Sequence, residues 1–217
     1  MKISYVITVH NEAEEIQKLL EVLNKNIDKE DEIIVCVDGD DEKVEAVLGE
    51  SLDSWQHYIV YKRKLDGNFA EHKNSVIEKS TGDYIFHIDA DEYPHETLLL
   101  QLKPILEVNE GVDLIWIPRV NTVEGFTQTD VRRYGWRMTE NNWVNYPDYQ
   151  ARVFRRDESI RWTRPLHEFI NGCKTYAHLP PQEEISLYHP KTIEKQEKQN
   201  MFYNQNFSRE MNSRSSL

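Results

Sequence analysis

The sequence predicts an α/β fold with a mostly parallel central sheet flanked by helices. Short apolar segments rich in β-branched residues alternate with segments of helical periodicity over residues 1–120. The first apolar segment, Ile3 to Val9, is almost continuously hydrophobic, as buried parallel strands are. One apolar stripe follows it at helical spacing: Ile16, Leu19, Leu20, Leu23 and Ile27. Strands and helices in this alternation build parallel sheets.

The remaining elements of the first half follow in the same rhythm. We expect strands at Glu32 to Asp38, Tyr58 to Tyr61, Tyr84 to Asp89 and Val112 to Val120. We expect helices from Asn11, with Glu14 three residues later, and at Asp41 to Leu48, Asn68 to Lys79 and Thr97 to Val108. Pro104 should kink or shorten the last of these helices.

The pattern changes after residue 120. Gly125 to Trp162 is dense in aromatic residues and arginines, with strand candidates at Gln150 to Phe154 and Ser159 to Trp162. From Lys191 the sequence is polar and helix-forming, and Asn212 to Leu217 has the composition of a frayed end. We therefore expect one domain over 1–190, with halves 1–120 and 121–190, followed by a helical tail over 191–217.

Composition narrows the class of protein. A formal net charge of -12 disfavours nucleic acid or an anionic membrane as the main partner. No apolar run is long enough to cross a bilayer, and the first residues do not form a secretory signal. We expect a cytoplasmic protein, with peripheral attachment to a membrane as an alternative. Two distant cysteines form neither a disulfide framework nor a zinc site.

Arginines and aromatic residues gather in the second half. The arginines are Arg119, Arg132, Arg133, Arg137, Arg152, Arg155, Arg156, Arg161 and Arg164. They indicate either a local site for an anion or a surface with ordinary ion pairs. The aromatic residues Trp136, Trp143, Tyr146, Tyr149 and Trp162 could stack on sugar rings, although we expect at least half of them in the core.

A ligand site is expected at the carboxyl ends of the parallel strands. Polar residues follow three of the expected strands, at Thr8 to Asn11, Asp38 to Asp41 and Asp89 to Glu92. Neither glycine-rich phosphate-binding motif, G-x-G-x-x-G after the first strand or G-x-x-x-x-G-K-[ST] anywhere, is present. A diphosphate bound here would therefore need another source of positive charge.

Asp89 and Asp91 offer such a source indirectly, through a metal ion. In an extended segment, residues two apart point to one side, so these carboxylates would face the same way. Mg²⁺ and Mn²⁺ bind through one or two carboxylates together with substrate phosphates. In the alternative interpretation, Asp91 or Glu92 caps the helix that begins near Pro94.

Several motifs in this order resemble the family-two glycosyltransferases with the GT-A fold. They are YVITVHNE (5–12), VCVDGDD (35–41), NFAEHKNSVIEKSTGDYIFHIDADE (68–92), YQARVFRR (149–156) and PLHEF (165–169). The last two resemble the branch that includes lipopolysaccharide-core glucosyltransferases. The resemblance covers residues 3 to 190 and implies a GT-A-like fold with an aromatic and arginine-rich acceptor segment and a C-terminal helix.

The resemblance implies inverting transfer of a sugar from a nucleotide-diphospho-sugar, commonly uridine-linked. By its motifs, Thr8, His10 and Glu12 would line the nucleotide pocket, and Asp38 would contact the base or ribose. Asp89 would face ribose and metal, and Asp91 would bind Mn²⁺ or Mg²⁺ directly. Two segments depart from the family pattern: Lys73 stands where arginine is usual, and Gly39, Asp40 and Asp41 replace aspartate-glycine-serine.

Each of these residues also has a structural interpretation. His10 could be a hydrogen-bonding turn residue, and Asp38 could cap the helix at Asp41. Lys73 could be a solvated helix side chain rather than a phosphate contact. His167 and His189 are candidates for a further metal ligand, although lone histidines are more often packed or hydrogen-bonded.

Inverting transfer needs a base that accepts the proton of the acceptor hydroxyl. Glu168 is the first candidate, because the resemblance places it near the acceptor, and Asp148 is the second. An ion pair between Glu168 and Arg164 is the competing interpretation. We expect a saccharide acceptor, with a peptide or lipid-linked acceptor as alternatives. The C-terminal helix could cover the site or form a homo-oligomer.

The sequence is also compatible with two other classes of protein. A nucleotidyltransferase also uses a metal and paired aspartates on an α/β sheet, but usually has a glycine-rich basic loop near its N-terminus, which HNEAEE (10–15) is not. A non-catalytic nucleotide-sugar-binding protein would be compatible with the altered loop at 39–41 and with Lys73.

Overall fold

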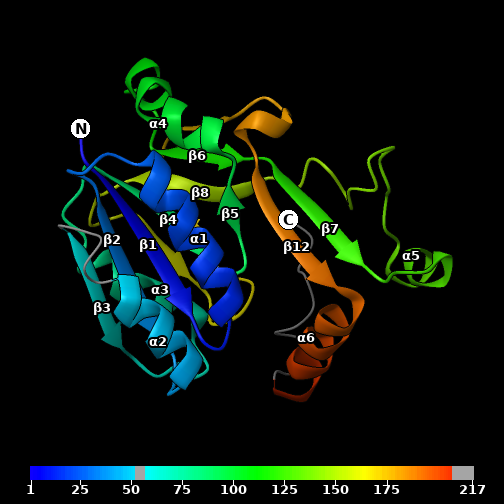
Figure 1. Ribbon diagram of the computed structural model, residues 1–217. Helices are drawn as coiled ribbons and strands as arrows, with labels where there is room; N and C mark the ends of the chain where they lie inside the picture. Colours follow the sequence, from blue (N-terminus) through cyan, green and yellow to red (C-terminus); the bar gives the residue numbers. More distant parts are fainter. Residues whose placement is uncertain (52–56, 207–217) are drawn as a thin grey trace.

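A computed structural model describes residues 1–51 and 57–206. Its main sheet has the strand order β11-β6-β8-β4-β1-β2-β3 (Figure 1). The strands β1 (Ile3–Val9), β2 (Glu32–Val37), β3 (Tyr58–Lys62) and β4 (Tyr84–Asp89) form its parallel half. In this half β1 lies between β2 and β4, and β3 follows β2. The predicted α/β fold with a mostly parallel sheet is confirmed.

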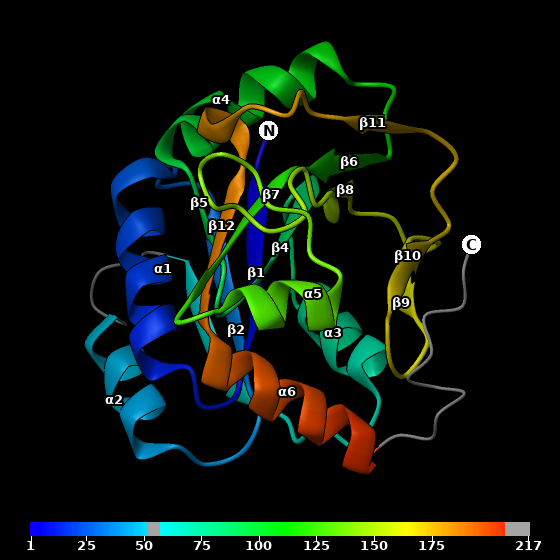
Figure 2. The ribbon, with the colours of Figure 1, turned by 90° about the vertical axis from the view of Figure 1, so that its right-hand side faces the viewer.

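Helices cover both faces of this sheet (Figures 1 and 2). They are α1 (Ala13–Asn26), α2 (Glu42–Ser51), α3 (Phe69–Ile77) and α4 (Glu96–Val108). Alternate residues of β1 enter two separate cores because successive side chains point to opposite faces. Tyr5 and Ile7 pack with α1, α2 and α4, whereas Val6 packs with α3. The apolar stripe of α1 is buried as predicted.

The ends of two helices differ from the sequence prediction. The first begins at Ala13 rather than Asn11, because Glu12 is its N-cap. Glu12 Oε2 instead accepts hydrogen bonds from the backbone N–H groups of His10 and Asn11, at 2.9 and 3.1 Å. Pro104 does not shorten α4, which runs through it to Val108. Its ring is exposed, so the missing N–H faces water.

The strand expected at Val112 to Val120 is in fact two strands in different sheets. β6 (Leu114–Ile117) belongs to the main sheet, and β7 (Arg119–Glu124) belongs to a three-stranded sheet. Pro118 lies between them and has no N–H to continue a ladder. Its carbonyl accepts a hydrogen bond from Leu187 N at 2.9 Å. The chain therefore leaves the main sheet at this proline.

The three-stranded sheet carries part of the site described below. Its central strand, β12 (Leu187–Thr192), runs parallel to β7 and antiparallel to β5 (Tyr93–Pro94). Within the main sheet, β8 (Gln150–Arg155) lies antiparallel between β4 and β6. The expected strand at Gln150 to Phe154 is therefore confirmed.

Apart from the C-terminal helix α6, the other elements of the second half are short. They are α5 (Gln128–Tyr134), β9 (Arg161–Thr163), β10 (Phe169–Asn171), β11 (Tyr176–His178), a 3-10 turn η2 (Glu183–Ile185) and α6 (Ile193–Asn206). β12 continues through the expected domain boundary at 190 and leads directly into α6. The segment expected to fray, 212–217, lies outside the described residues.

Aromatic residues of the second half are less buried than expected. Of the five singled out above, only Trp162 is buried, packing against α3 and Phe154. Trp143 and Tyr146 pack edge to face, and Trp136 stacks on Tyr134, all partly exposed. The expectation that at least half would lie in the core is wrong, because short strands and loops offer little interior.

The amino end of the parallel strands is closed by Glu32. Its carboxylate accepts hydrogen bonds from Lys2 Nζ, Ser4 Oγ and both the N–H and hydroxyl of Thr81, at 2.5 to 2.7 Å. Gly82 N donates to the same Ser4 hydroxyl, and a Cβ at Gly82 would lie 2.8 Å from Ser4 N. Only glycine fits this approach.

No helix in the described part of the chain is long and apolar enough to cross a membrane.

Candidate active site

Three strand ends meet at the carboxyl edge of the sheet, as predicted. Thr8 of β1 is paired with Asp89 of β4, and Asp38 N donates to Val9 O at 2.8 Å. His10 Nδ1 lies 2.7 Å from the backbone oxygen of Asp38. The predicted nucleotide-site residues of β1, β2 and β4 therefore share one edge.

Asp38 does not cap α2. Its Oδ1 accepts a hydrogen bond from Leu65 N at 2.7 Å, which ties the loop after β3 to the strand edge. The cap is Asp41, whose Oδ1 accepts from the N–H groups of Lys43 and Val44, each at 3.0 Å. The helix-cap interpretation of Asp38 is wrong.

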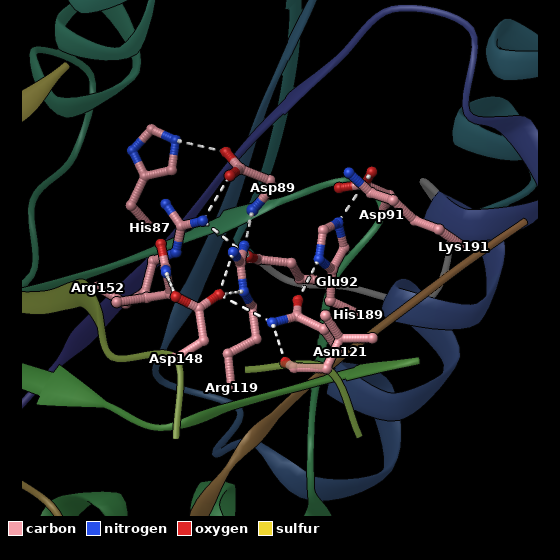
Figure 3. Close-up of polar contacts among 12 residues, drawn as sticks. His87, Asp89, Asp91, Glu92, Arg119, Asn121, Asp148, Arg152, His189 and Lys191 are labelled. Carbon is pink, nitrogen blue, oxygen red and sulfur yellow. Dashed lines mark hydrogen bonds and ion pairs between the residues drawn. The ribbon is translucent and has the colours of Figure 1, made fainter. Parts of the chain in front are cut away.

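Behind this edge lies a chain of largely buried ion pairs, which we call the inner network. Figure 3 shows its part from Asp89 to Asp148. It consists of Lys73, Asp89, Glu92, Arg119, Asp148, Arg152 and Glu168. Lys73 Nζ lies 3.0 Å from Asp89 Oδ1 and 2.7 Å from Glu168 Oε1. Arg152 Nη2 lies 2.5 Å from Asp89 Oδ2. Asp89 is thus held on both oxygens.

The inner network continues through Glu92, whose side chain is fully buried. Glu92 Oε1 accepts from Arg152 at 2.7 Å and from Arg119 at 2.6 Å. Arg119 then holds Asp148 Oδ2 through Nε and Nη2, at 3.0 and 2.6 Å. Glu92 therefore does not cap α4. His95 caps it, with Nδ1 accepting from Thr97 N.

Burial and pairing act against each other in this network. Burial alone would lower the pKa of Lys73, but the carboxylates of Asp89 and Glu168 outweigh it, so that pKa is raised. Burial likewise opposes ionisation of Glu168 and Asp148, yet Lys73 and Arg119 hold both carboxyl pKa values below their ordinary range. Lys73 is 6% exposed, so its solvated interpretation is wrong.

His87, two residues before Asp89 in β4, is also buried in this region. Neither ring nitrogen has a hydrogen-bond partner in the described structure, and Nε2 lies 4.0 Å from Asp89 Oδ1. Its ring packs edge to face on Trp162. Burial and the nearby Lys73 lower its pKa well below the ordinary value, so the imidazole is neutral.

Asp91 faces a second group, which we call the outer cluster: Asp91, His189, Lys191, Lys195 and Glu15. β4 ends at Asp89, and Glu92 N bonds to Asp89 O across a turn, so the extended alternation does not reach Asp91. Asp91 Oδ2 lies 3.4 Å from His189 Nε2 and 3.6 Å from Lys195 Nζ. The expectation that Asp89 and Asp91 face one way is therefore wrong.

His189 links the two groups. Its Nδ1 lies 2.8 Å from Asn121 Oδ1, and Asn121 Nδ2 donates to Asp148 Oδ2 at 2.9 Å. Burial lowers the pKa of His189 despite the neighbouring Asp91. Although burial opposes it, His189 and the nearby lysines lower the pKa of Asp91.

The fit to a metal ion is partial. Among residues 1–51 and 57–206, no three His, Cys, Asp or Glu side chains are placed to hold a metal. Asp91 and His189 are adjacent and can supply two ligands, with substrate phosphates supplying the others. Asp89 is already paired with Lys73 and Arg152. The residues therefore fit Mn²⁺ or Mg²⁺ only together with a bound phosphate-bearing ligand.

Several site residues were not found from sequence. Glu92, Arg119 and Arg152 complete the inner network, and Lys191 and Lys195 complete the outer cluster. Strand periodicity was the available signal, since His189 and Lys191 are two residues apart in one strand and share a face.

The chain belongs to glycosyl transferase family 2, whose family model matches residues 4–178. It is similar to the poly(ribitol-phosphate) beta-glucosyltransferase of Bacillus spizizenii, at 32% identity over 106 residues, 46% of this chain and 16% of that protein. The structure of S. aureus TarS 1-349 in complex with UDP-GlcNAc matches with a TM-score of 0.65 at 16% identity, over 88% of this chain and 59% of that one.

A longer S. aureus TarS structure matches equally, with a TM-score of 0.65 over 88% of this chain and 37% of that one. The chain thus spans less than two thirds of the length of each of these relatives. The structural likeness confirms the expected GT-A-like fold, and the family match confirms the resemblance to family-two glycosyltransferases.

Proposed function

We propose that this chain transfers a sugar from a nucleotide-diphospho-sugar, uridine-linked, to a hydroxyl of a glycan or related polymer, with inversion. The observation that carries the proposal is the meeting of Asp38, Asp89 and Asp91 at the carboxyl edge of the parallel strands, in a family-two chain. Family membership favours sugar transfer over nucleotidyl transfer. It also favours an enzyme over a non-catalytic nucleotide-sugar-binding protein.

The donor would lie along this edge. Thr8, His10 and Asp38 are proposed to contact the nucleoside, while Glu12 shapes the turn that carries His10. Asp91 and His189 would hold Mn²⁺ or Mg²⁺, which supplies charge stabilisation for the departing diphosphate when bound. Asp89 faces Lys73 and Arg152, so we propose that it orients the edge and contacts ribose. Lys73 holds Asp89 and Glu168 rather than a phosphate.

The base remains a choice between two carboxylates. Lowered pKa values keep both Glu168 and Asp148 ionised near neutral pH, as a proton acceptor must be. Glu168 has one paired cation, Lys73, whereas Asp148 Oδ2 is bonded to Arg119 and Asn121. We therefore propose Glu168 as the base and Asp148 as the runner-up.

The acceptor and the boundaries of the domain are also proposals. The name of the Bacillus relative points to a polyol-phosphate polymer, and TarS was solved with UDP-GlcNAc. A polymer hydroxyl on such a chain is the acceptor we propose, in preference to a lipopolysaccharide core, a peptide or a lipid-linked glycan. Residues 1–190 would form the transferase domain, and α6 would lie beside its active site. Sugar transfer would take place in the cytoplasm, with the protein peripheral to the membrane.

A thermal-shift series tests the donor first. We expect UDP-glucose or UDP-GlcNAc to raise the melting temperature in the presence of Mn²⁺, and GDP-mannose to leave it unchanged, because a ligand stabilises the state it binds. Sugar transfer to a poly(ribitol-phosphate) acceptor would then be followed by mass spectrometry. No shift with any nucleotide-sugar would contradict the proposed donor.

A further inference from the structure

Two lysines of the C-terminal segment lie beside the strand-end acids. Lys191 is in β12, on the same face as His189, and Lys195 is in the first turn of α6. Figure 3 shows Lys191 extending beside Asp91 and His189. Lys195 Nζ lies 3.6 Å from Asp91 and 2.8 Å from Glu15 Oε1. Both ammonium groups therefore flank the acid proposed to hold the metal.

Lys191 has no carboxylate counter-ion. In the described part of the chain no acidic oxygen lies within 4.0 Å of its Nζ, which donates instead to the amide oxygen of Gln199 at 2.9 Å. A part-buried ammonium group without a paired anion costs free energy. Such a group is expected where a ligand supplies the missing negative charge.

The other cations of the site are already neutralised. Arg152 is shared by Asp89 and Glu92, and Arg119 by Glu92 and Asp148. Lys73 is shared by Asp89 and Glu168. A glycine-rich phosphate loop is absent from the sequence. Lys191, which has no carboxylate counter-ion in the described structure, is thus the least neutralised cation beside the strand edge. Lys195 lies next to it and is paired with Glu15 and, at 3.6 Å, with Asp91.

We propose that Lys191 and Lys195 bind the diphosphate of the nucleotide-sugar donor. This inference rests on the proposed function. In transfer, the acceptor oxygen forms a bond to the anomeric carbon while the bond from that carbon to the phosphate oxygen breaks. The electron pair leaves with the diphosphate, and the hydroxyl proton goes to the base. Fixed ammonium groups beside the diphosphate stabilise the charge that develops there.

The structure also explains how the second lysine becomes available. Lys195 is shared between Asp91 and Glu15, about one third exposed, and its Asp91 contact is long. A metal ion on Asp91 would repel the Lys195 ammonium group from that carboxylate. A phosphate oxygen of the donor would then take the place of Asp91 as the partner of Lys195. Donor binding would then tie α6 to the strand edge through the ligand.

The test compares UDP with uridine, since only UDP carries the diphosphate. Titration calorimetry with Mn²⁺ constant would give the Kd of both for the wild type, Lys191→Met, Lys195→Met and the control Lys198→Met. Lys198 is exposed and lies in α6, as Lys195 does. We expect Lys191→Met and Lys195→Met each to raise the Kd for UDP at least about ten-fold, because each removes one charge-assisted contact to the diphosphate. Uridine affinity and the Lys198→Met variant should be unchanged.

The melting temperature without ligand separates a ligand role from a structural one. Lys191→Met removes an unpaired part-buried charge, so its unliganded melting temperature should stay the same or rise. If Lys191→Met fails to fold, Lys195→Met and the charge-keeping Lys191→Arg decide. Wild-type UDP affinity in Lys195→Met, or equal loss of uridine and UDP, would overturn the inference. A wild-type protein that binds no UDP would instead overturn the proposed function.

Discussion

Each end of the parallel strands carries an acidic residue with basic neighbours, but the two carboxylates differ in how closely the protein binds them. At the amino end, Glu32 accepts four short hydrogen bonds from Lys2, Ser4 and Thr81. At the carboxyl end, Asp91 has His189 at 3.4 Å and Lys195 at 3.6 Å, both longer than an ordinary hydrogen bond. One carboxylate is saturated by the protein and the other is not.

This difference separates structural acids from acids that are available to a ligand. A buried carboxylate with all its partners closes a seam between strands and loops. A carboxylate whose partners are distant keeps lone pairs for a metal ion or a substrate. The inner network shows a graded form of this distinction within one edge. Asp89 has a cation on each oxygen, Lys73 and Arg152, while its side chain is still 31% exposed.

Removing the proposed base should have the largest effect. We expect Glu168→Gln to lower kcat about 10²- to 10⁴-fold, as loss of a general base does, and Asp148→Asn to lower it less. Steady-state kinetics with the donor that the thermal-shift series selects would measure both, with urea unfolding to verify that each variant is folded. A larger loss of kcat in Asp148→Asn would indicate that Asp148, not Glu168, is the general base.

Asp91→Asn should follow, with a loss of about 10²- to 10³-fold in kcat/KM, the size seen when one electrostatic stabiliser is removed. Its free energy of unfolding should fall by about 1 kcal/mol, because His189 and the nearby lysines stabilise the ionised carboxylate from 3.4 Å and beyond. Asp40→Asn is the matched control, since Asp40 follows β2 at the same edge and its side chain is 84% exposed. Equal losses in both variants would show that the effect on kcat/KM is not specific to Asp91.

Glu32→Gln should show the reverse behaviour. We expect a loss of about 1–3 kcal/mol in the free energy of unfolding, because charge-assisted hydrogen bonds to Lys2 and Thr81 are removed at a buried site. Donor affinity should be unchanged. Urea unfolding would measure the first and calorimetry the second, with exposed Glu30→Gln as control. Weakened donor binding in Glu32→Gln would show that the amino end also serves the site.

The pH dependence of stability gives the smallest effect. Although burial raises it, hydrogen bonds from Lys2, Ser4 and Thr81 lower the pKa of Glu32 from 4.5 to about 2. Between these values the unfolded chain binds more protons than the folded one, so stability falls as the pH is lowered from 4.5 towards 2. Unfolding curves across this range should be less steep in pH for Glu32→Gln. An unchanged slope would mean that other acids dominate acid unfolding.

Much of the donor half could be predicted from sequence. Continuous apolar strands and one apolar stripe on α1 specify burial on fixed faces, and this local periodicity survives in the structure. The strand-end polar segments then follow from the parallel topology. The second half was less predictable, because its strands are short and Pro118 transfers the chain to another sheet.

The sequence by itself determined the fold class, the alternation of strands and helices along the first half of the chain, and the acids that follow the strands. Side-chain periodicity, which carries this information, is a local property. Only the tertiary structure decided which charges meet. Arg152 and Lys73 come from distant segments to neutralise Asp89, while β12 brings His189 and Lys191 to Asp91. Ion pairs join residues far apart in the chain, and no sequence period encodes that distance.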